Sequence, residues 1–171
     1  LRDFAVQGME LINVSPQRSD SSSDAHWLPV IPGTDTAMML GIAYHLVTKD
    51  LVDRDFLDRC TVGFERFRAY LLGETDNQPK SPKWAEKICG IDESILCNLA
   101  QKMASTRTLI TVAWSLQRCQ YGEQPFWMAA TLAAMLGQIG LPGGGIGYGY
   151  GALGGIGVSV SKLKGLTLPQ G

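Results

Sequence analysis

The sequence has few residues of the kinds that bind metals or form disulfide networks. Its only histidines, His26 and His45, have no cysteine and no cluster of acidic residues beside them. The four cysteines are separated by 29, 8 and 22 residues, and no C-x-x-C pair occurs. This spacing fits neither a zinc knuckle nor an iron–sulfur motif, and the cysteines are too few for a disulfide scaffold. We therefore expect free thiols and no metal site.

The chain also lacks an excess of charge of either sign. Fifteen Lys and Arg residues oppose 16 Asp and Glu residues among 171, so the net charge is -1. This balance argues against binding of nucleic acid or an anionic membrane through net charge. The hydrophobic fraction of 45% is typical of a globular chain, and the glycines show no period of three. A disordered tail and a collagen-like filament are therefore excluded.

One long stretch contains no charged residue at all. Residues 124–161 are 38 consecutive residues without Asp, Glu, Lys or Arg, and we expect them to be buried against a partner surface. The strongest apolar run, residues 125–136, is shorter than the roughly 20 residues of a membrane span. Arg2, Asp3 and Glu10 interrupt any signal-peptide core. Because the chain also starts in what reads as the end of a helix, we expect a piece cut from a larger protein.

Hydrophobic patterning predicts strands that alternate with helices. Residues 9–14 and 27–31 are predicted as short strands, and residues 108–113 as a β-branched strand buried on both faces. Residues 73–82 read as an exposed linker and residues 114–122 as a loop. Apolar residues at helical spacing predict helices after Pro32-Gly33, with Thr34 or Asp35 as the cap, and over residues 53–59, 64–72, from Asp92 onward, and 123–138. This order predicts an α/β fold with a parallel sheet flanked by helices.

In such a sheet, ligands bind beyond the carboxyl ends of the strands. Three segments leave these predicted ends: residues 13–18, 32–35 and 114–118. Within the second segment, Asp35 stands at a helix start, where a carboxylate stabilises the positive end of the helix dipole. The same carboxylate could instead accept two parallel hydrogen bonds from guanine, which adenine cannot offer.

The other polar and aromatic residues of these segments also allow two interpretations each. Arg118 could bind a phosphate through two hydrogen bonds, or could be a solvated loop arginine. Ser15 and Ser115 could donate to phosphate or ribose oxygens, or could serve as turn residues. Trp114 could form a stacking wall or part of the core. The residue types alone leave these alternatives open.

Glycine is concentrated near the C-terminus. Ten of the 20 glycines fall between Gly140 and Gly157, and Gly149 to Gly154 spell G-x-G-x-x-G. A dinucleotide-binding fingerprint needs a strand before it, a helix after it and an acidic residue about 20 positions on. Here a predicted helix precedes the glycines, and no Asp or Glu follows Glu123. We interpret the cluster as a flexible, uncharged segment and not as a phosphate cradle.

Several longer segments of the chain form a recognisable set. The main ones are WSLQR at 114–118, GEQ at 122–124, WM at 127–128 and LAAMLGQIGLPGGG at 132–145. Supporting segments are PGTD at 32–35, MLGIA at 39–43, FLDRCTVGF at 56–64, YLLGE at 70–74 and WAEKICG at 84–90. Together these segments resemble the dimethyl sulfoxide, trimethylamine N-oxide and biotin sulfoxide reductase family, whose members are molybdenum enzymes with two molybdopterin guanine dinucleotides. The resemblance covers residues 9 to about 149. The chain departs from the family at Ser15, where members commonly carry asparagine, and at Tyr121, where many carry histidine.

The resemblance implies the family's central α/β domain, a Rossmann-type module that holds one of the two guanine dinucleotides. It implies a partial cofactor-binding domain over residues 1–145 and a glycine-rich segment over residues 146–171 that leads into the rest of a larger enzyme. Residues carried over to the guanosine end are Asn13, Ser15, Gln17, Gly33, Thr34 and Asp35. Residues carried over to the phosphates and the pterin are Trp114, Ser115 and Arg118.

The resemblance also implies which functions this chain lacks. It places the protein ligand of molybdenum upstream, so we expect no catalytic or metal-ligating residue and an inactive chain. The implied partners are the remaining domains of the same chain and a small S-oxide or N-oxide, with no nucleic acid and no membrane span. The implied compartment is the bacterial periplasm or cytoplasm. Two alternatives stay open: a free-standing guanine-nucleotide-binding module and a non-catalytic α/β scaffold.

Overall fold

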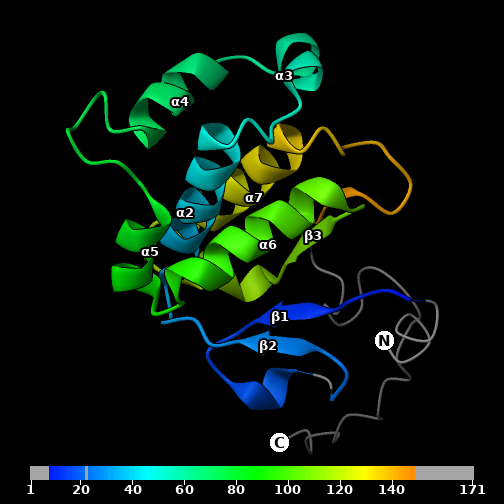
Figure 1. Cartoon of the computed structure of the whole chain (residues 1–171). Coiled ribbons are helices and arrows are strands. Elements are labelled where there is room, and N and C mark those ends of the chain that lie inside the picture. The colour runs from blue at the N-terminus through cyan, green and yellow to red at the C-terminus, as the bar shows by residue number, and fades with distance from the viewer. Residues whose placement is uncertain (1–7, 22, 149–171) are drawn as a thin grey trace, which may run out of the picture.

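Helices form most of the structure, with short parallel strands at two places beside them (Figure 1). The structure is a computed structural model that describes residues 8–21 and 23–148. With η for 3-10 helices, the elements are β1 (Ile12–Val14), η1 (Arg18–Asp20), β2 (His26–Leu28), α2 (Asp35–Thr48), α3 (Arg54–Cys60), α4 (Phe64–Leu71), α5 (Pro82–Cys89), α6 (Glu93–Ser105), β3 (Leu109–Val112), η2 (Trp114–Arg118), α7 (Gln124–Met135) and β4 (Gly145–Tyr148).

Helix α2 lies at the centre of the core. It is apolar on nearly every side, and it packs against α5, α6 and α7. A Cβ atom at Gly41 would lie only 2.6 Å from Ala85 Cβ, so α5 reaches this close to α2 because the residue is glycine. The buried residues of α2 are Met38, Met39, Leu40, Gly41, Ile42, Ala43, His45 and Leu46.

Helix α7 accounts for much of the uncharged stretch. Its buried residues include Met128, Leu132 and Met135, and the helix contacts α2, α3 and β3. The chain's own core therefore covers this part of the stretch, where we had expected an external partner surface. No helix in the described part of the chain is both long enough and apolar enough to cross a membrane.

The strands form two separate parallel pairs among the described residues. Strand β1 pairs with β2 from Ile12↔His26 to Val14↔Leu28, which confirms a parallel α/β arrangement. Strand β3 pairs with β4 from Leu109↔Gly145 to Val112↔Tyr148. The sequence did not predict β4, which lies in the segment interpreted as flexible. Its pairing partner is more than 30 residues away, so no local pattern indicated it.

Strand β3 is covered on one face only. Its residues Ile110 and Val112, with Ile146 of β4, pack against the core. Leu109 is 47% exposed, and Thr111 is also exposed. The prediction that both faces are buried is therefore wrong for the described residues. The strand alternates between a face on α7 and an open face, where the β4 partners Gly145 and Gly147 add no side chain.

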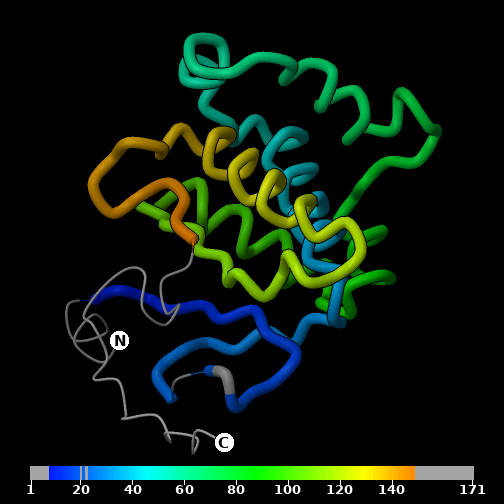
Figure 2. Tube along the Cα trace, turned by 180° about the vertical axis from the view of Figure 1, so that it is seen from behind, coloured from blue at the N-terminus to red at the C-terminus, as the bar shows by residue number. Residues whose placement is uncertain are grey.

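The segment predicted as an exposed linker is folded around one buried side chain. Lys80 is buried, and its Nζ donates to Asp76 Oδ2 at 2.6 Å and to the Gln78 carbonyl oxygen. The same Nζ lies 4.2 Å from the centroid of the Tyr70 ring. Most of this segment is exposed, but the ammonium group ties it to α4. Helices α3 and α4 lie at the end of the molecule away from β1 and β2 in both views (Figures 1 and 2).

Candidate functional site

The carboxyl ends of β1 and β2 lie side by side because the two strands are parallel neighbours. The Ser15 amide donates to the Leu28 carbonyl oxygen at 3.2 Å, one residue beyond β1. Ser15 is buried, and its hydroxyl oxygen accepts the Gln17 amide at 3.2 Å. The Ser15 carbonyl oxygen accepts the indole N–H of Trp27 at 2.8 Å. Ser15 therefore organises the turn that leaves β1.

The rest of this first segment also makes contacts within its own loop. The Asn13 side-chain amide donates to the Ser21 hydroxyl oxygen at 2.7 Å. The Arg18 guanidinium carbon lies 5.7 Å from the centroid of the Trp27 ring. Gln17 precedes η1 and is exposed. The sequence-based prediction did not identify Trp27 as the residue that Arg18 and Ser15 contact in this loop. An arginine before the mostly polar residues 19–26 and a tryptophan after them could have indicated a cation–π contact.

The second segment forms an open turn at the start of α2. Gly33 has φ +78°, and a Cβ atom added there would meet nothing within 4 Å. The Thr34 amide and hydroxyl both donate to the Ile31 carbonyl oxygen, at 3.2 and 2.6 Å. Thr34 occupies the N-cap position of α2, as predicted, but its side chain makes no capping hydrogen bond.

Asp35 is a half-buried carboxyl group in the first turn of α2. Burial raises its pKa above the ordinary value, and a hydrogen bond to its own backbone lowers the pKa by less. No charged neighbour among the described residues contributes to this shift. The carboxyl group is thus partly removed from water without a cation to compensate its charge.

The third segment follows β3 and is the most exposed of the three. Residues 114–118 form η2, where the sequence predicted an irregular loop, and none of them is buried. Trp114 is 41% exposed, and Ser115 and Arg118 are exposed. Within the described residues, the side chains of Ser115 and Arg118 make no hydrogen bond or ion pair. Both therefore keep their full capacity to donate hydrogen bonds to a ligand.

The structure brings the predicted site residues together in two groups. Asn13, Ser15 and Gln17 surround the end of the β1–β2 pair, and the turn at Gly33 follows β2 along the chain. Trp114, Ser115 and Arg118 follow β3, which belongs to the other two-stranded sheet. The strand-end rule selected exposed or half-buried polar residues in both groups, together with the buried Ser15, but the described strands do not join the two groups into one sheet.

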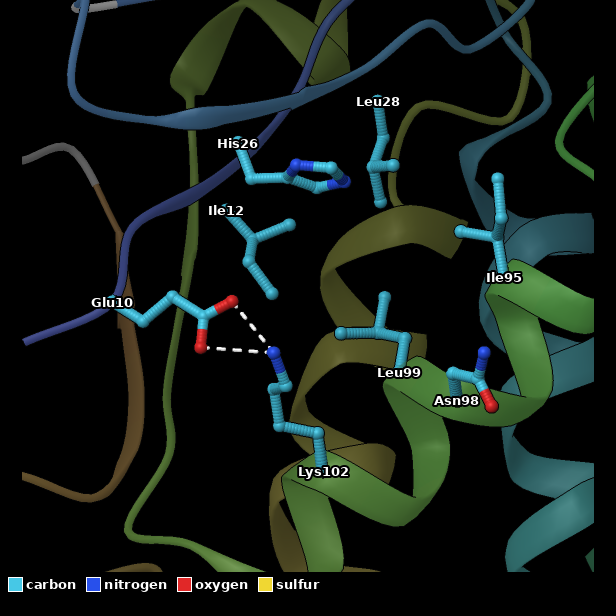
Figure 3. A pocket seen from close by; sticks show the side chains of 8 residues that line it. All are labelled: Glu10, Ile12, His26, Leu28, Ile95, Asn98, Leu99 and Lys102. Carbon is cyan, nitrogen blue, oxygen red and sulfur yellow. Dashed lines mark hydrogen bonds and ion pairs between the residues drawn. The ribbon is translucent and has the colours of Figure 1, made fainter.

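A cavity of about 370 Å³ lies elsewhere, between the β1–β2 pair and α6 (Figure 3). Its apolar lining includes Ile12, Leu28 and Leu99. At its edge, Lys102 Nζ donates to both carboxylate oxygens of Glu10, at 2.6 and 2.9 Å. These two charges satisfy each other, so the cavity offers no unpaired charged group to a ligand. Within residues 8–21 and 23–148, no group of three His, Cys, Asp or Glu residues is placed to hold a metal ion.

Comparison with known proteins decides the family. The family model described as molybdopterin oxidoreductase matches residues 1–167. The chain belongs to this family. The match extends over both groups of predicted site residues and over the charge-free stretch.

Curated relatives share close to half of their aligned residues with this molybdopterin oxidoreductase chain. Biotin sulfoxide reductase of Cereibacter sphaeroides is 50% identical over 99% of this chain and 23% of that protein. Trimethylamine-N-oxide reductase of Haemophilus influenzae is 47% identical over 87% of this chain and 18% of that protein. Dimethyl sulfoxide/trimethylamine N-oxide reductase of Rhodobacter capsulatus is 43% identical over 98% of this chain and 21% of that protein. The chain thus spans about a fifth of the length of these relatives.

A solved structure supports the fold independently. Acetylene hydratase from Pelobacter acetylenicus matches with a TM-score of 0.70 and 23% identity, over 81% of this chain and 18% of that chain. At this identity the likeness concerns the fold alone. It is consistent with an α/β chain of small parallel strands covered by helices.

Proposed function

We propose that this chain is the part of a molybdenum-dependent S-oxide or N-oxide reductase that holds a molybdopterin guanine dinucleotide, one of two in the whole enzyme. In this proposal the chain is a Rossmann-type domain, and the rest of the enzyme supplies the metal ligand. The relatives' names support the substrate class, since the chain shares 43–50% identity with three such reductases. The observation that carries the proposal is that Ser115 and Arg118 are unpaired within the described residues and that the half-buried Asp35 has no cationic partner there.

Asp35 fits the guanine end of this cofactor. Its carboxyl group is half-buried and carries no cationic partner among the described residues, so its charged form needs hydrogen-bond donors. Guanine offers two donors side by side, N1–H and the exocyclic amino group, which match the two carboxylate oxygens. The open turn at Gly33 leaves space for a base to approach. Asn13, Ser15, Gln17 and Thr34 would line the same end in this proposal.

Arg118 and Ser115 fit the phosphates. Both side chains are exposed and unpaired within the described residues, and both follow strand β3. A guanidinium group binds phosphate through two parallel hydrogen bonds, and a hydroxyl group adds one more. Trp114, which is half-exposed, would cover a planar part of the cofactor. When bound, the molybdenum cofactor supplies the redox chemistry that removes an oxygen atom from the S-oxide or N-oxide.

The test is the cofactor content of the full-length enzyme with Asp35→Asn. Asparagine keeps the size of the side chain but removes one acceptor oxygen and the negative charge. Loss of a charge-assisted hydrogen bond of about 1.5–3 kcal/mol corresponds to a roughly 10- to 150-fold loss of affinity. We expect less guanosine monophosphate per protein after acid hydrolysis, measured by mass spectrometry.

The matched control is Asp58→Asn, which changes an exposed carboxylate of α3. We expect it to keep the cofactor content of the unchanged enzyme. Equal cofactor content in the Asp35 and Asp58 variants would contradict the assignment of guanine to Asp35. If the full-length protein carried no guanine dinucleotide at all but bound GTP saturably, a guanine-nucleotide-binding module would replace the proposal.

A further inference from the structure

Tyr121 has an unusual backbone conformation for an aromatic residue. Its φ is +58°, in the left-handed region, and its side chain is 68% exposed. This region costs a side chain other than glycine or asparagine roughly 1–2 kcal/mol. Its ring forms no hydrogen bond and no aromatic contact within the described residues. The ring therefore gives this part of the chain little packing energy in return for the strain.

The turn around Tyr121 is held by its backbone. The Gly122 amide donates to the Cys119 carbonyl oxygen at 3.1 Å, and the Gln124 amide donates to the Tyr121 carbonyl oxygen at 2.9 Å. Gly122 is buried so closely against the Gln117 backbone that a Cβ atom there would collide with the Gln117 carbonyl oxygen. The backbone thus closes onto η2 and leaves the Tyr121 side chain outside the turn.

The turn belongs to the same exposed segment as Arg118, only three residues earlier in the chain. Ser115 and Arg118 are unpaired within the described residues, and Trp114 is partly exposed. An exposed phenol in the same short segment as an unpaired guanidinium group and an unpaired hydroxyl group suits a ligand that has both phosphates and flat rings. The cofactor of the proposed function has this combination.

We propose that Tyr121 is a further cofactor-contact residue, whose ring packs on a planar ring of the guanine dinucleotide bound by η2. This inference rests on the proposed function and extends its site beyond the residues at the strand ends. The contact explains why an exposed aromatic side chain occupies a position where glycine or asparagine would fold with less strain.

Three variants of the full-length enzyme test the contact. Tyr121→Phe keeps the ring, Tyr121→Asn removes it but tolerates the left-handed conformation, and Tyr121→Gly removes both ring and strain. We expect about tenfold lower cofactor retention with asparagine or glycine, the scale of losing one stacking contact, and retention within about twofold with phenylalanine. Retention is measured as released guanosine monophosphate and as molybdenum per protein.

A second measurement separates contact from structure. The thermal midpoint of the cofactor-free enzyme should stay level or rise in Tyr121→Asn and Tyr121→Gly, because the backbone strain is relieved. A midpoint that falls together with cofactor retention would overturn the contact and make Tyr121 structural. Trp127→Gln is the matched control, since Trp127 is 64% exposed but lies in regular helix. An equal loss of cofactor in this control would also overturn the assignment to Tyr121.

The same assay distinguishes this inference from the proposed function. If Asp35→Asn and Arg118→Gln lose cofactor while Tyr121→Asn retains it, only the Tyr121 contact fails. If none of the three variants loses cofactor, the proposed function fails and the contact fails with it.

Discussion

Gln138 joins the end of α7 to the start of β3 through one buried side chain. Its Oε1 accepts the Thr108 amide at 2.6 Å. Its Nε2 donates to the Thr106 carbonyl oxygen at 2.9 Å and to the Met103 carbonyl oxygen at 3.4 Å. The side-chain amide thereby provides hydrogen-bond partners for backbone groups at the end of α6 and in the segment that leads to β3.

We expect Gln138→Leu to loosen this connection. Leucine leaves the Thr108 amide without its acceptor, and a buried unsatisfied donor costs about 1–3 kcal/mol. Amide exchange over residues 106–110 of the full-length protein should then become roughly 5- to 150-fold faster. Hydrogen exchange followed by mass spectrometry measures this change. Gln120→Leu, at an exposed position, should leave the exchange unchanged.

Lys80 is a second buried polar side chain that holds a connecting segment, here the one between α4 and α5. Its ammonium group is buried against the Tyr70 ring and donates to Asp76, and this hydrogen bond lowers the pKa of Asp76. We expect Lys80→Met to make residues 73–81 more susceptible to a protease that does not cut at lysine. The control is Lys83→Met, because Lys83 is exposed. Equal cleavage rates in the two variants would show that Lys80 does not hold the segment.

At the scale of elements, the contact between α2 and α6 contains a buried histidine. His45 of α2 is buried, and its Nε2 lies 3.4 Å from the side-chain nitrogen of Gln101 on α6. Burial lowers the pKa of His45 below its ordinary value, and the nearby charge of Lys49 lowers it further. The folded protein therefore favours the neutral imidazole.

This histidine predicts a pH-dependent loss of stability. Below the ordinary histidine pKa of about 6.5, the unfolded chain gains a proton that the folded chain does not yet bind. Stability should therefore fall as the pH drops from about 6.5 toward the lowered pKa. We expect the thermal midpoint to decrease less between pH 7.5 and 5.5 in His45→Gln than in the unchanged protein. His26→Gln serves as the control for the loss of an exposed histidine.

An exposed ion pair links the residues just before β1 to α6. Glu10 and Lys102 point toward each other across the edge of the cavity, and both side chains are about half-exposed (Figure 3). Exposed ion pairs contribute about 0.2–1 kcal/mol and weaken in salt. A double-mutant cycle with Glu10→Gln and Lys102→Gln should give a coupling in this range that shrinks at 1 M salt. A larger coupling that salt does not change would contradict an exposed pair.

At the scale of the whole molecule, the described chain leaves one sheet face open. Leu109 and Thr111 of β3 are exposed on this face, and their partners Gly145 and Gly147 of β4 add no side chain to it. Open apolar sheet faces associate with other surfaces. We propose that other domains of the whole enzyme cover this face, since the relatives are several times longer than this chain.

The open face predicts self-association of the 171-residue chain when it is produced alone. Leu109→Lys should reduce the concentration-dependent increase in mass measured by sedimentation, because it places a charge on the sheet. Val62→Lys is the control, since Val62 is 99% exposed but stands at a helix–helix turn away from the sheet. The same reduction in both variants would mean that added charge, and not the sheet face, controls association.

The sequence by itself determined five of the six α-helices and three of the four strands in the described residues, and it determined the family; it did not predict α5. Apolar residues at helical spacing identify α2 and α7, and a β-branched run identifies β3, because these signals lie within the segment that forms the element. The strand-end rule selected Asp35, Ser115 and Arg118 from chain order alone. Their contacts with a cofactor remain predictions.

Only the tertiary structure decided the features that depend on distant residues. Strand β4 exists through pairing with β3, Lys80 is buried because Tyr70 and Asp76 surround it, and the outer face of β3 stays open because no described element covers it. The strained turn at Tyr121 likewise depends on the close contact of Gly122 with Gln117. Local patterns report what a segment prefers, whereas burial and pairing depend on which parts of the chain meet in space.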